Sequence, residues 1–312
     1  MKFSVTIPAY KKKYLKECID SILSQSYSDF ELIIVNDASP EDLDSVISLY
    51  SDIRIRYYKN EQNCGAVNVV DNWNKCLNYA KGDYIICMGD DDRLLPNCLE
   101  EYSKLIERYP RLGVYHAWTE IIDEESQVYD IQDARPSWES ALSLLWNRWS
   151  YRTKQYIGDF LFETDLLKRN GGFKKFPLAW SSDDISAVMA ATQTGCANTQ
   201  TLCFQYRVNR YNISSSGNAE LKIKAVEEKK EWVKDFLEKL DINSLTESDV
   251  IYYHLLETKL DGIIKKRLIY YITTDIAKNP IRIIRWIMKS KELNIGKVSM
   301  IKEVLKAGMS HL

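Results

Sequence analysis

The sequence predicts an α/β protein with a mostly parallel central sheet flanked by helices and with a helical C-terminal extension. Two observations favour the sheet: strand-like and helix-like segments alternate from residue 3 to residue 88, and several of the strands are continuous apolar runs. Such alternation is typical of parallel sheets covered by helices on both faces. The third observation is the almost wholly helical periodicity after about residue 220, which predicts the extension.

The first half of the chain supplies the predicted elements in order. Phe3, Val5 and Ile7 alternate with polar residues and form a first strand, which Pro8 ends. Apolar residues at helical spacing predict the next helix: Leu15, Cys18, Ile19, Ile22 and Leu23. Further strands are predicted at residues 32–35, 53–58 and 84–88, with helices at residues 43–50 and 66–80 between them.

Three adjacent acids follow the fourth strand and precede a helix that Pro96 opens. Asp90, Asp91 and Asp92 thus stand at the carboxyl end of a strand, where open α/β sheets bind their ligands. Three neighbouring anions repel one another, so a cation is the natural compensation. Oxygen ligands in this number suit Mg²⁺ or Mn²⁺ shared with a phosphate. The alternative is a solvated acidic turn.

Composition limits the classes of protein. The 312 residues suit one large domain or two, and the net charge of −2 hides an acidic body and a basic tail, since residues 259–312 hold 12 Lys and Arg against 4 Asp and Glu. Seven Cys without a Cys-x-x-Cys pair argue against zinc and disulfides and fit a reducing cytoplasm. No signal peptide or membrane-spanning run is visible, so a cytoplasmic location is expected. The Gly-x-Gly-x-x-Gly and P-loop fingerprints are absent.

Five motifs occur in register along the first part of the chain. They are Val5-Thr6-Ile7-Pro8-Ala9-Tyr10; Ser21-Ile22-Leu23-Ser24-Gln25-Ser26-Tyr27; Ile33-Ile34-Val35-Asn36-Asp37-Ala38-Ser39; Asn63-x-Gly65 with Trp73-Asn74-Lys75 and Ala80-Lys81-Gly82-Asp83-Tyr84-Ile85; and Met88-Gly89-Asp90-Asp91-Asp92-Arg93-Leu94-Leu95-Pro96. Together they resemble the family 2 glycosyltransferases, which have the GT-A fold. The resemblance is strong for residues 3–118, weaker for 156–216 and absent after that.

The resemblance implies a domain organisation and an activity. A GT-A domain would cover residues 1–218, with a nucleotide-sugar-binding half (1–118) and an acceptor-binding half (119–218), followed by a helical region (219–312). It would be an inverting glycosyltransferase that uses a UDP-sugar and Mn²⁺ or Mg²⁺ and glycosylates a hydroxyl of a glycan or lipid-linked acceptor in surface polysaccharide synthesis. Two alternatives stay open: a catalytically silent sugar-nucleotide-binding protein, and a sugar nucleotidyltransferase, which normally needs a Gly-rich basic loop.

The resemblance also assigns donor-binding residues. Asp37 would accept a hydrogen bond from the uracil N–H, with Pro8, Ala9 and Tyr10 beneath the base; alternatively, Asp37 bonds its own turn. Asn74 and Lys75 would touch ribose or phosphate, or else form a solvated helix face. Asp91 and Asp92 match the family's last two acids and are the predicted metal ligands. Asp90 takes the variable position beside them and is counted with the donor site.

Three residues depart from the family pattern. Gly89 replaces its first acid in the Asp cluster, and Asn36 replaces the first acid of its "VDDGS" motif. Asn209, in Tyr206-Arg207-Val208-Asn209, stands where a His could supply a further metal contact. The neighbouring Arg207 is predicted to contact the diphosphate, with an ordinary surface Arg as the alternative.

A second acidic pair is predicted to supply the general base. Asp183 and Asp184 follow a "GGF"-like segment at residues 170–173 and precede an apolar helical stretch closed by Gly195. Counting back from that glycine places them on the family's acidic pair, which implies that Asp184 is the base and Asp183 an orienting carboxylate. A helix N-terminus also favours the ionised form that a base requires. The alternative is that one of them only caps the helix.

The remaining expectations concern partners. Residues 276–306 form a basic amphipathic stretch with an aromatic residue, which could lie peripherally on an anionic membrane and serve a lipid-linked acceptor. An ordinary packed helix and a homodimer interface are the alternatives. Trp138, Trp146 and Trp149 lie on a predicted helical segment, where they could stack on acceptor sugars or belong to the core.

Overall fold

The computed structural model describes residues 1–209, 218–293 and 295–296. The chain divides into two compact units, residues 1–216 and residues 217–312. The first unit contains every site residue that the sequence predicts, and the second contains the helical region. Among the described residues, no helix combines the length and the apolar character needed to cross a membrane.

One mixed sheet forms the centre of the first unit, with the order β3-β2-β1-β4-β9-β6-β10-β5, while β7 and β8 pair with β6 and β10. The strands are β1 (Phe3–Ala9), β2 (Phe30–Asn36), β3 (Ile55–Lys59), β4 (Tyr84–Cys87), β5 (Arg93–Leu94), β6 (Val114–Ile122), β7 (Val128–Ile131), β8 (Trp138–Glu139), β9 (Phe160–Glu163) and β10 (Cys196–Arg207). The first three pairings in this order, from β3 to β4, are parallel, and β9 then lies antiparallel between β4 and β6. The predicted α/β fold is confirmed: the first half of the sheet is wholly parallel, and the second half is mixed, with β6 and β10 parallel.

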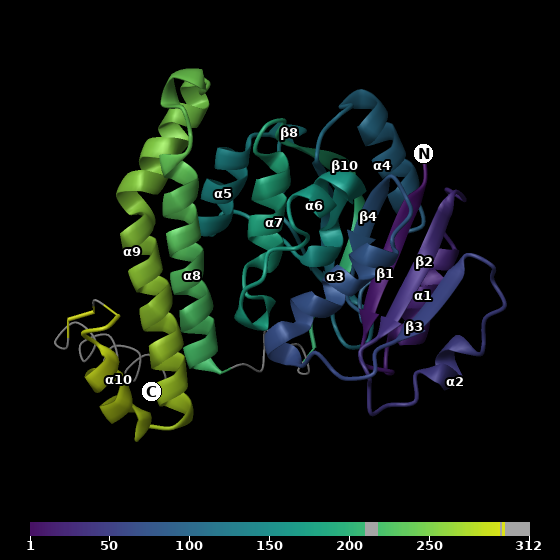
Figure 1. The fold of residues 1–312 in the computed structure, drawn as a ribbon, viewed down its shortest axis with the longest axis horizontal. Helices are drawn as coiled ribbons and strands as arrows, with labels where there is room; N and C mark the ends of the chain where they lie inside the picture. Colours follow the sequence, from purple (N-terminus) through teal and green to yellow (C-terminus); the bar gives the residue numbers. More distant parts are fainter. Residues whose placement is uncertain (210–217, 294, 297–312) are drawn as a thin grey trace. The chain divides into compact units, whose positions relative to one another are not determined.

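Helices lie on both sides of this sheet (Figure 1). They are α1 (Leu15–Leu23), α2 (Asp44–Ile47), α3 (Val69–Tyr79), α4 (Cys98–Arg108), α5 (Ala141–Trp149), α6 (Thr164–Arg169) and α7 (Ser182–Ala191). Side chains along β1 point alternately to the two faces of the sheet, and each face packs against a different set of helices. Phe3, Val5 and Ile7 point into an apolar cluster with α1, α2 and α4. The opposite face of β1 and β2 receives α3, where Asn72 donates to the Val35 carbonyl oxygen at 3.2 Å.

The second unit is built on a long helical hairpin of α8 (Ala219–Glu238) and α9 (Glu247–Lys278), which lie side by side in Figure 1. The shorter α10 (Arg282–Lys289) packs on α9. Its cations are largely neutralised within the unit: Arg285 and Lys289 pair with Glu220, and Arg282 pairs with Asp275. These ion pairs weaken the electrostatic basis of the predicted membrane contact. Residues 297–306 of the predicted stretch lie outside the described residues.

The placement of the three tryptophans corrects one prediction. Trp138 lies in β8 and not on a helix, and its indole Nε1 donates to the Thr194 carbonyl oxygen at 3.0 Å. Only Trp146 and Trp149 lie on α5, and both are buried. They are therefore core side chains and do not form a stacking platform for sugars.

Candidate active site

The predicted donor residues meet at the carboxyl ends of three neighbouring parallel strands. β1 lies between β2 and β4, so the turn after Ala9, the turn after Asn36 and the acidic cluster after Cys87 emerge at one edge of the sheet. Parallel strands bring their carboxyl ends together because they run in the same direction, and ligands of open α/β sheets bind at this edge. The sequence therefore located the site through its strand ends.

Asp37 does not form its own turn. Its carboxylate accepts hydrogen bonds from Asn60 Nδ2 at 2.7 Å and from the Cys64 backbone N–H at 3.0 Å. The turn is instead closed by Asn36, whose Oδ1 accepts from the Ser39 N–H at 2.9 Å. The turn-forming alternative for Asp37 is therefore wrong. Asn36, which departs from the family pattern, has a structural role in shaping this turn.

Lys75 and Asn74 leave α3 with different roles. Asn74 pairs with the backbone of Phe173: its Oδ1 accepts from the N–H at 2.8 Å and its Nδ2 donates to the carbonyl at 3.2 Å. It thereby fixes the "GGF" turn, which neither prediction for Asn74 anticipated. Lys75 forms no ion pair within the described part of the chain. Burial and Asp37 raise the pKa of Cys64 to about 11, and the charge of Lys75 acts against this rise. Lys75 thus remains a cation near Cys64, whose backbone N–H binds Asp37, and its charge suits a phosphate.

Asp90 ties the acidic cluster to the turn after β1. Its Oδ2 accepts from the backbone N–H groups of Tyr10 and Lys11 at 2.6 and 2.7 Å. Burial and the neighbouring Asp91 raise the pKa of Asp90 to about 6, and the Lys11 ammonium acts in the opposite direction. Asp90 is therefore a structural carboxylate that holds the Pro8-Ala9-Tyr10 turn in place. Lys11, which carries no motif signal, is a site residue that sequence reasoning missed.

Asp91 and Asp92 converge on the position of Gly89. A Cβ atom built on Gly89 would lie 2.8 Å from Asp91 Oδ1 and 2.9 Å from Asp92 Oδ2. A side chain at position 89 would therefore collide with both carboxylates, so the glycine gives them room to approach each other. Burial raises the pKa of both acids, and Asp91 raises that of Asp92 further.

Two converging carboxylates, of the half-buried Asp91 and the buried Asp92, fit a divalent cation. Mg²⁺ is commonly held by one or two carboxylates and completes its coordination with waters and substrate phosphates. Among the described residues, no group of three or more His, Cys, Asp or Glu side chains that could hold a metal ion is found. Asn209 lies beside the pair, since its Nδ2 donates to Asp91 Oδ2 at 2.7 Å. Asp91 and Asp92 would be the protein ligands, and the amide nitrogen of Asn209 orients one of them.

Arg207 is buried inside the protein and is not a surface residue. Its backbone N–H donates to Asp92 Oδ1 at 2.9 Å and its Nε donates to the Asp91 carbonyl at 2.8 Å. The guanidinium also bonds the Asp123 carbonyl and Ser126, and pairs with Glu17 Oε2 at 2.9 Å. These contacts replace the predicted diphosphate contact with a structural role: Arg207 fixes the segment that carries Asp91 and Asp92.

Arg207→Met is expected to lower the free energy of unfolding by about 3 kcal/mol, because the Asp91 and Asp123 carbonyl oxygens lose the donor that the buried guanidinium supplies. Chemical denaturation would measure the change, with Arg169→Met as the matched control, since Arg169 is exposed and forms only a long surface pair with Glu163. An Arg207→Met protein of unchanged stability that had lost UDP affinity would restore the diphosphate assignment.

The second acidic pair opens α7 after an unusual backbone segment. Leu178, Ala179 and Ser181 all have positive φ angles of 60°, 53° and 77°. Such conformations are costly for residues other than glycine and gather at functional sites. The N-cap of α7 is Ser181, so neither Asp183 nor Asp184 occupies the capping position. The capping alternative therefore does not hold for Asp184.

Asp184 is fully buried and held by two donors. Arg148 Nε, from α5, donates to Asp184 Oδ1 at 2.7 Å, and Gln155 Nε2 donates to the same oxygen at 2.9 Å. Asp184 and Asp183 together raise the pKa of Arg148 against the effect of its burial. Asp183 is only half-buried. Arg148 and Gln155 are further site residues that the sequence gave no means of finding.

A pair of tyrosines connects the two acidic centres. The rings of Tyr156 and Tyr206 stack with centroids 3.5 Å apart. Tyr156 follows Gln155, which binds Asp184, and Tyr206 precedes Arg207, whose N–H binds Asp92. Burial is the main cause that raises the pKa of Tyr156. The Asp92 charge raises this pKa further, and the Arg148 charge lowers it. The Tyr156–Tyr206 stack therefore joins the segment that contacts Asp184 to the segment that contacts Asp92.

An α/β sheet whose parallel strands end beside a cluster of acidic residues is the arrangement of the GT-A class of glycosyltransferases. The chain matches the model of glycosyl transferase family 2 over residues 4–175. This protein therefore belongs to glycosyl transferase family 2, as the motifs predicted.

Similar proteins support this assignment. An uncharacterised glycosyltransferase of Methanocaldococcus jannaschii is 36% identical over 130 residues, which cover 40% of this chain and 44% of the relative. The putative colanic acid biosynthesis glycosyltransferase WcaA of Escherichia coli is 36% identical over 102 residues, which cover 32% of this chain and 36% of that protein. The chain thus spans less than half the length of these relatives.

A solved structure extends the likeness of fold to the whole chain. The crystal structure of S. aureus TarS residues 1–349 in complex with UDP-GlcNAc superposes with a TM-score of 0.62 and 16% identity, covering 100% of this chain and 91% of TarS 1–349. At this identity the likeness concerns the fold alone.

Proposed function

We propose that this protein is an inverting glycosyltransferase that moves a sugar from a UDP-sugar to a hydroxyl group of a glycan or lipid-linked acceptor. The observation that carries the proposal is the convergence of Asp91 and Asp92 on Gly89, at the sheet edge that also presents Asp37. A uracil N–H can be bound by Asp37, while a diphosphate can share a cation with the acidic pair. The TarS complex with UDP-GlcNAc supports UDP as the nucleotide.

The chemistry follows from the roles of the two acidic centres. Asp184 takes the proton of the acceptor hydroxyl, whose oxygen attacks the anomeric carbon as the bond to the diphosphate breaks. A divalent cation held by Asp91 and Asp92 would neutralise the charge that builds up on the leaving diphosphate. Attack from the side opposite the leaving group inverts the anomeric configuration. Lys75 and Lys11 supply positive charge at the same edge of the sheet.

A role in surface polysaccharide synthesis is part of the proposal. It is supported by the name of the E. coli relative, which refers to colanic acid biosynthesis. The acceptor would then be a growing glycan, free or attached to a lipid carrier. A cytoplasmic location, peripheral at the inner face of the membrane where such an acceptor is lipid-linked, would place the enzyme beside its substrates.

A donor-hydrolysis screen tests the function. Purified protein is incubated with UDP-, GDP- and dTDP-sugars in the presence of Mn²⁺ or of EDTA, and nucleotide release is measured. UDP release from at least one UDP-sugar, with at least tenfold less in EDTA, is expected. Metal-dependent UDP binding without release from any donor would instead identify a silent binding protein. Pyrophosphate release from UTP and a sugar 1-phosphate would identify a nucleotidyltransferase.

A further inference from the structure

Gln155 lies between two charged groups that leave its amide only one orientation. Its Oε1 accepts from Arg135 Nη2 at 3.2 Å, and its Nε2 donates to Asp184 Oδ1 at 2.9 Å. A guanidinium can only donate hydrogen bonds and an ionised carboxylate can only accept them. The amide of Gln155 therefore turns its oxygen to Arg135 and its nitrogen to Asp184, and the reverse orientation would lose both bonds.

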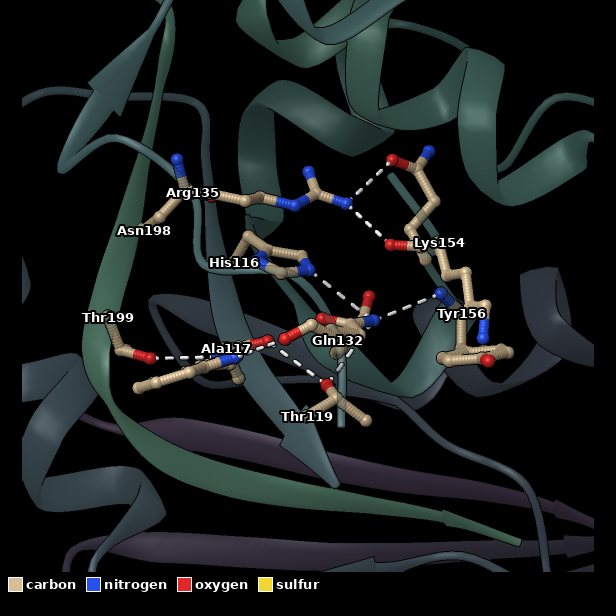
Figure 2. Close-up of polar contacts among 12 residues, drawn as sticks. His116, Ala117, Thr119, Gln132, Arg135, Lys154, Tyr156, Asn198 and Thr199 are labelled. Carbon is tan, nitrogen blue, oxygen red and sulfur yellow. Dashed lines mark hydrogen bonds and ion pairs between the residues drawn. The ribbon is translucent and has the colours of Figure 1, made fainter. Parts of the chain in front are cut away.

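Arg135 is itself fixed in place. Its Nη2 donates to the Lys154 carbonyl oxygen at 2.7 Å, a contact that Figure 2 shows, and its Nη1 lies 3.4 Å from Glu139 Oε1. Both Arg135 and Glu139 are buried, so this ion pair is shielded from solvent. The orientation imposed on Gln155 thus originates in a rigid buried charge pair.

Residues 154–159, which include Gln155, are also held in place on the C-terminal side of Gln155. Asp159, which is completely buried, accepts from the Tyr156 N–H at 3.1 Å and from Gln132 Nε2 at 2.8 Å, and lies 3.4 Å from His116 Nε2. Figure 2 shows His116, Gln132 and Tyr156 converging on this point. Residues 154–159 are therefore held on both sides of Gln155. Little freedom remains for the amide that contacts Asp184.

We propose that Gln155 is a positioning residue, oriented by Arg135, that together with Arg148 holds the Asp184 carboxylate in place to receive the acceptor proton. The inference rests on the proposed function, because it assigns Gln155 to the base of that reaction. A neutral donor suits this position. The amide of Gln155 fixes the Asp184 carboxylate without a full positive charge, which would make Asp184 a weaker base. Arg148 already supplies one cation to the same oxygen.

The charges around this contact determine the design of the test. The titratable and charged groups near Asp184 and Gln155 are Arg148 on α5, Asp183 on α7, and Tyr156, Asp159, Arg135 and Glu139 around the anchored segment. Gln155→Glu keeps an oxygen for Arg135 and keeps the length of the side chain. It replaces the amide donor facing Asp184 with a second carboxyl group, which repels the ionised form of Asp184 and so raises its pKa.

The pH dependence of UDP-GlcNAc hydrolysis with Mn²⁺ then reports the effect. In Gln155→Glu, the acid limb of kcat/KM is expected to move up by about one pH unit, with UDP affinity unchanged. Gln193→Glu is the matched control, because it makes the same substitution at an exposed residue after α7 and should leave the profile unaltered. An unchanged acid limb in Gln155→Glu, or an equal movement in the control, overturns the proposal.

A second measurement separates this inference from the proposed function. In protein labelled with ¹³C at the aspartate carboxyl carbons, the Asp184 resonance is identified by its absence in Asp184→Asn. Its pKa is expected to be about one pH unit higher in Gln155→Glu than in the wild type, and unchanged in Gln193→Glu. The same change in the Asp184 pKa is expected even if the protein hydrolyses no donor. In that case the proposed transferase function is wrong, but the contact between Gln155 and Asp184 is supported. An unmoved Asp184 resonance overturns the positioning role whatever the activity.

Discussion

Asp184→Asn is expected to reduce the rate of sugar transfer by about 10³-fold while UDP affinity stays unchanged, because the amide cannot take the proton of the acceptor hydroxyl. The Asn Oδ1 can still accept from Arg148 and Gln155, which donate to Asp184 at 2.7 and 2.9 Å, so the local geometry is retained. Initial-rate measurements with calorimetry of UDP binding would separate a loss in kcat from a loss of donor affinity.

Asp183→Asn is the matched control for this substitution. Asp183 is the neighbouring acid on the same first turn of α7, is only half-buried and has the same side chain. A smaller loss than in Asp184→Asn is expected, since Asp183 is assigned an orienting role. The reverse order, with Asp183→Asn inactive and Asp184→Asn active, would transfer the role of base to Asp183.

Asp92→Asn is expected to lower kcat by about 10³-fold or more, because losing one ligand of a cation at the leaving group removes several kcal/mol of transition-state stabilisation. The substitution keeps an oxygen that can accept from the Arg207 N–H, which donates to Asp92 at 2.9 Å. Titration of Mn²⁺ in the presence of UDP, followed by the paramagnetic signal of the free ion, would show weaker binding. Asp235→Asn, at an exposed position in α8, is the control.

Stability should change in the opposite direction from activity. Burial raises the pKa values of Asp90, Asp91 and Asp92, and repulsion from Asp91 adds to the effect at Asp92 and at Asp90, whose pKa reaches about 6. Carboxyl groups with raised folded-state pKa values destabilise the fold as they ionise. Without metal, stability should therefore fall as the pH rises from the usual aspartate pKa of about 4 through about 6.

Removing one of these charges should relieve that cost. In metal-free buffer at pH 7.5, the Tm of Asp92→Asn is expected to exceed that of the wild type by about 2–4 °C, a difference that disappears at pH 4. Mn²⁺ with UDP should raise the wild-type Tm more at pH 7.5 than at pH 5, since the cation binds the ionised carboxylates. A variant that loses both activity and stability at pH 7.5 would contradict the assigned repulsion.

The sequence predicted that the acids of the candidate donor site lie at neighbouring strand ends. Asp37, Asp91 and Asp92 each follow a short apolar strand, and parallel strands of one sheet end at the same edge, so local pattern was sufficient to bring them together. Gly89 was noted only as a departure from the family pattern. The space that it leaves for two carboxylates became visible only when the distances to its missing side chain were known.

The roles of individual polar side chains were harder to predict. Arg207 was expected to contact diphosphate and Asn74 to contact ribose, yet Arg207 fixes the segment that carries the acidic pair and Asn74 fixes the turn at Phe173. Both contacts join residues about 100 positions apart in the chain. A sequence pattern reveals that a side chain is polar, but its partner depends on which distant segment packs against it.

The sequence by itself determined the α/β class, the parallel first half of the sheet and the strand ends at which the acids lie. These features depend on local periodicity, which each segment carries within itself. Only the tertiary structure decided that β9 inserts antiparallel between β4 and β6, and that Arg148, Gln155 and Tyr156 gather around Asp184. Those arrangements depend on long-range pairing and on the burial of charges, whose energies arise only when remote segments exclude water from one another.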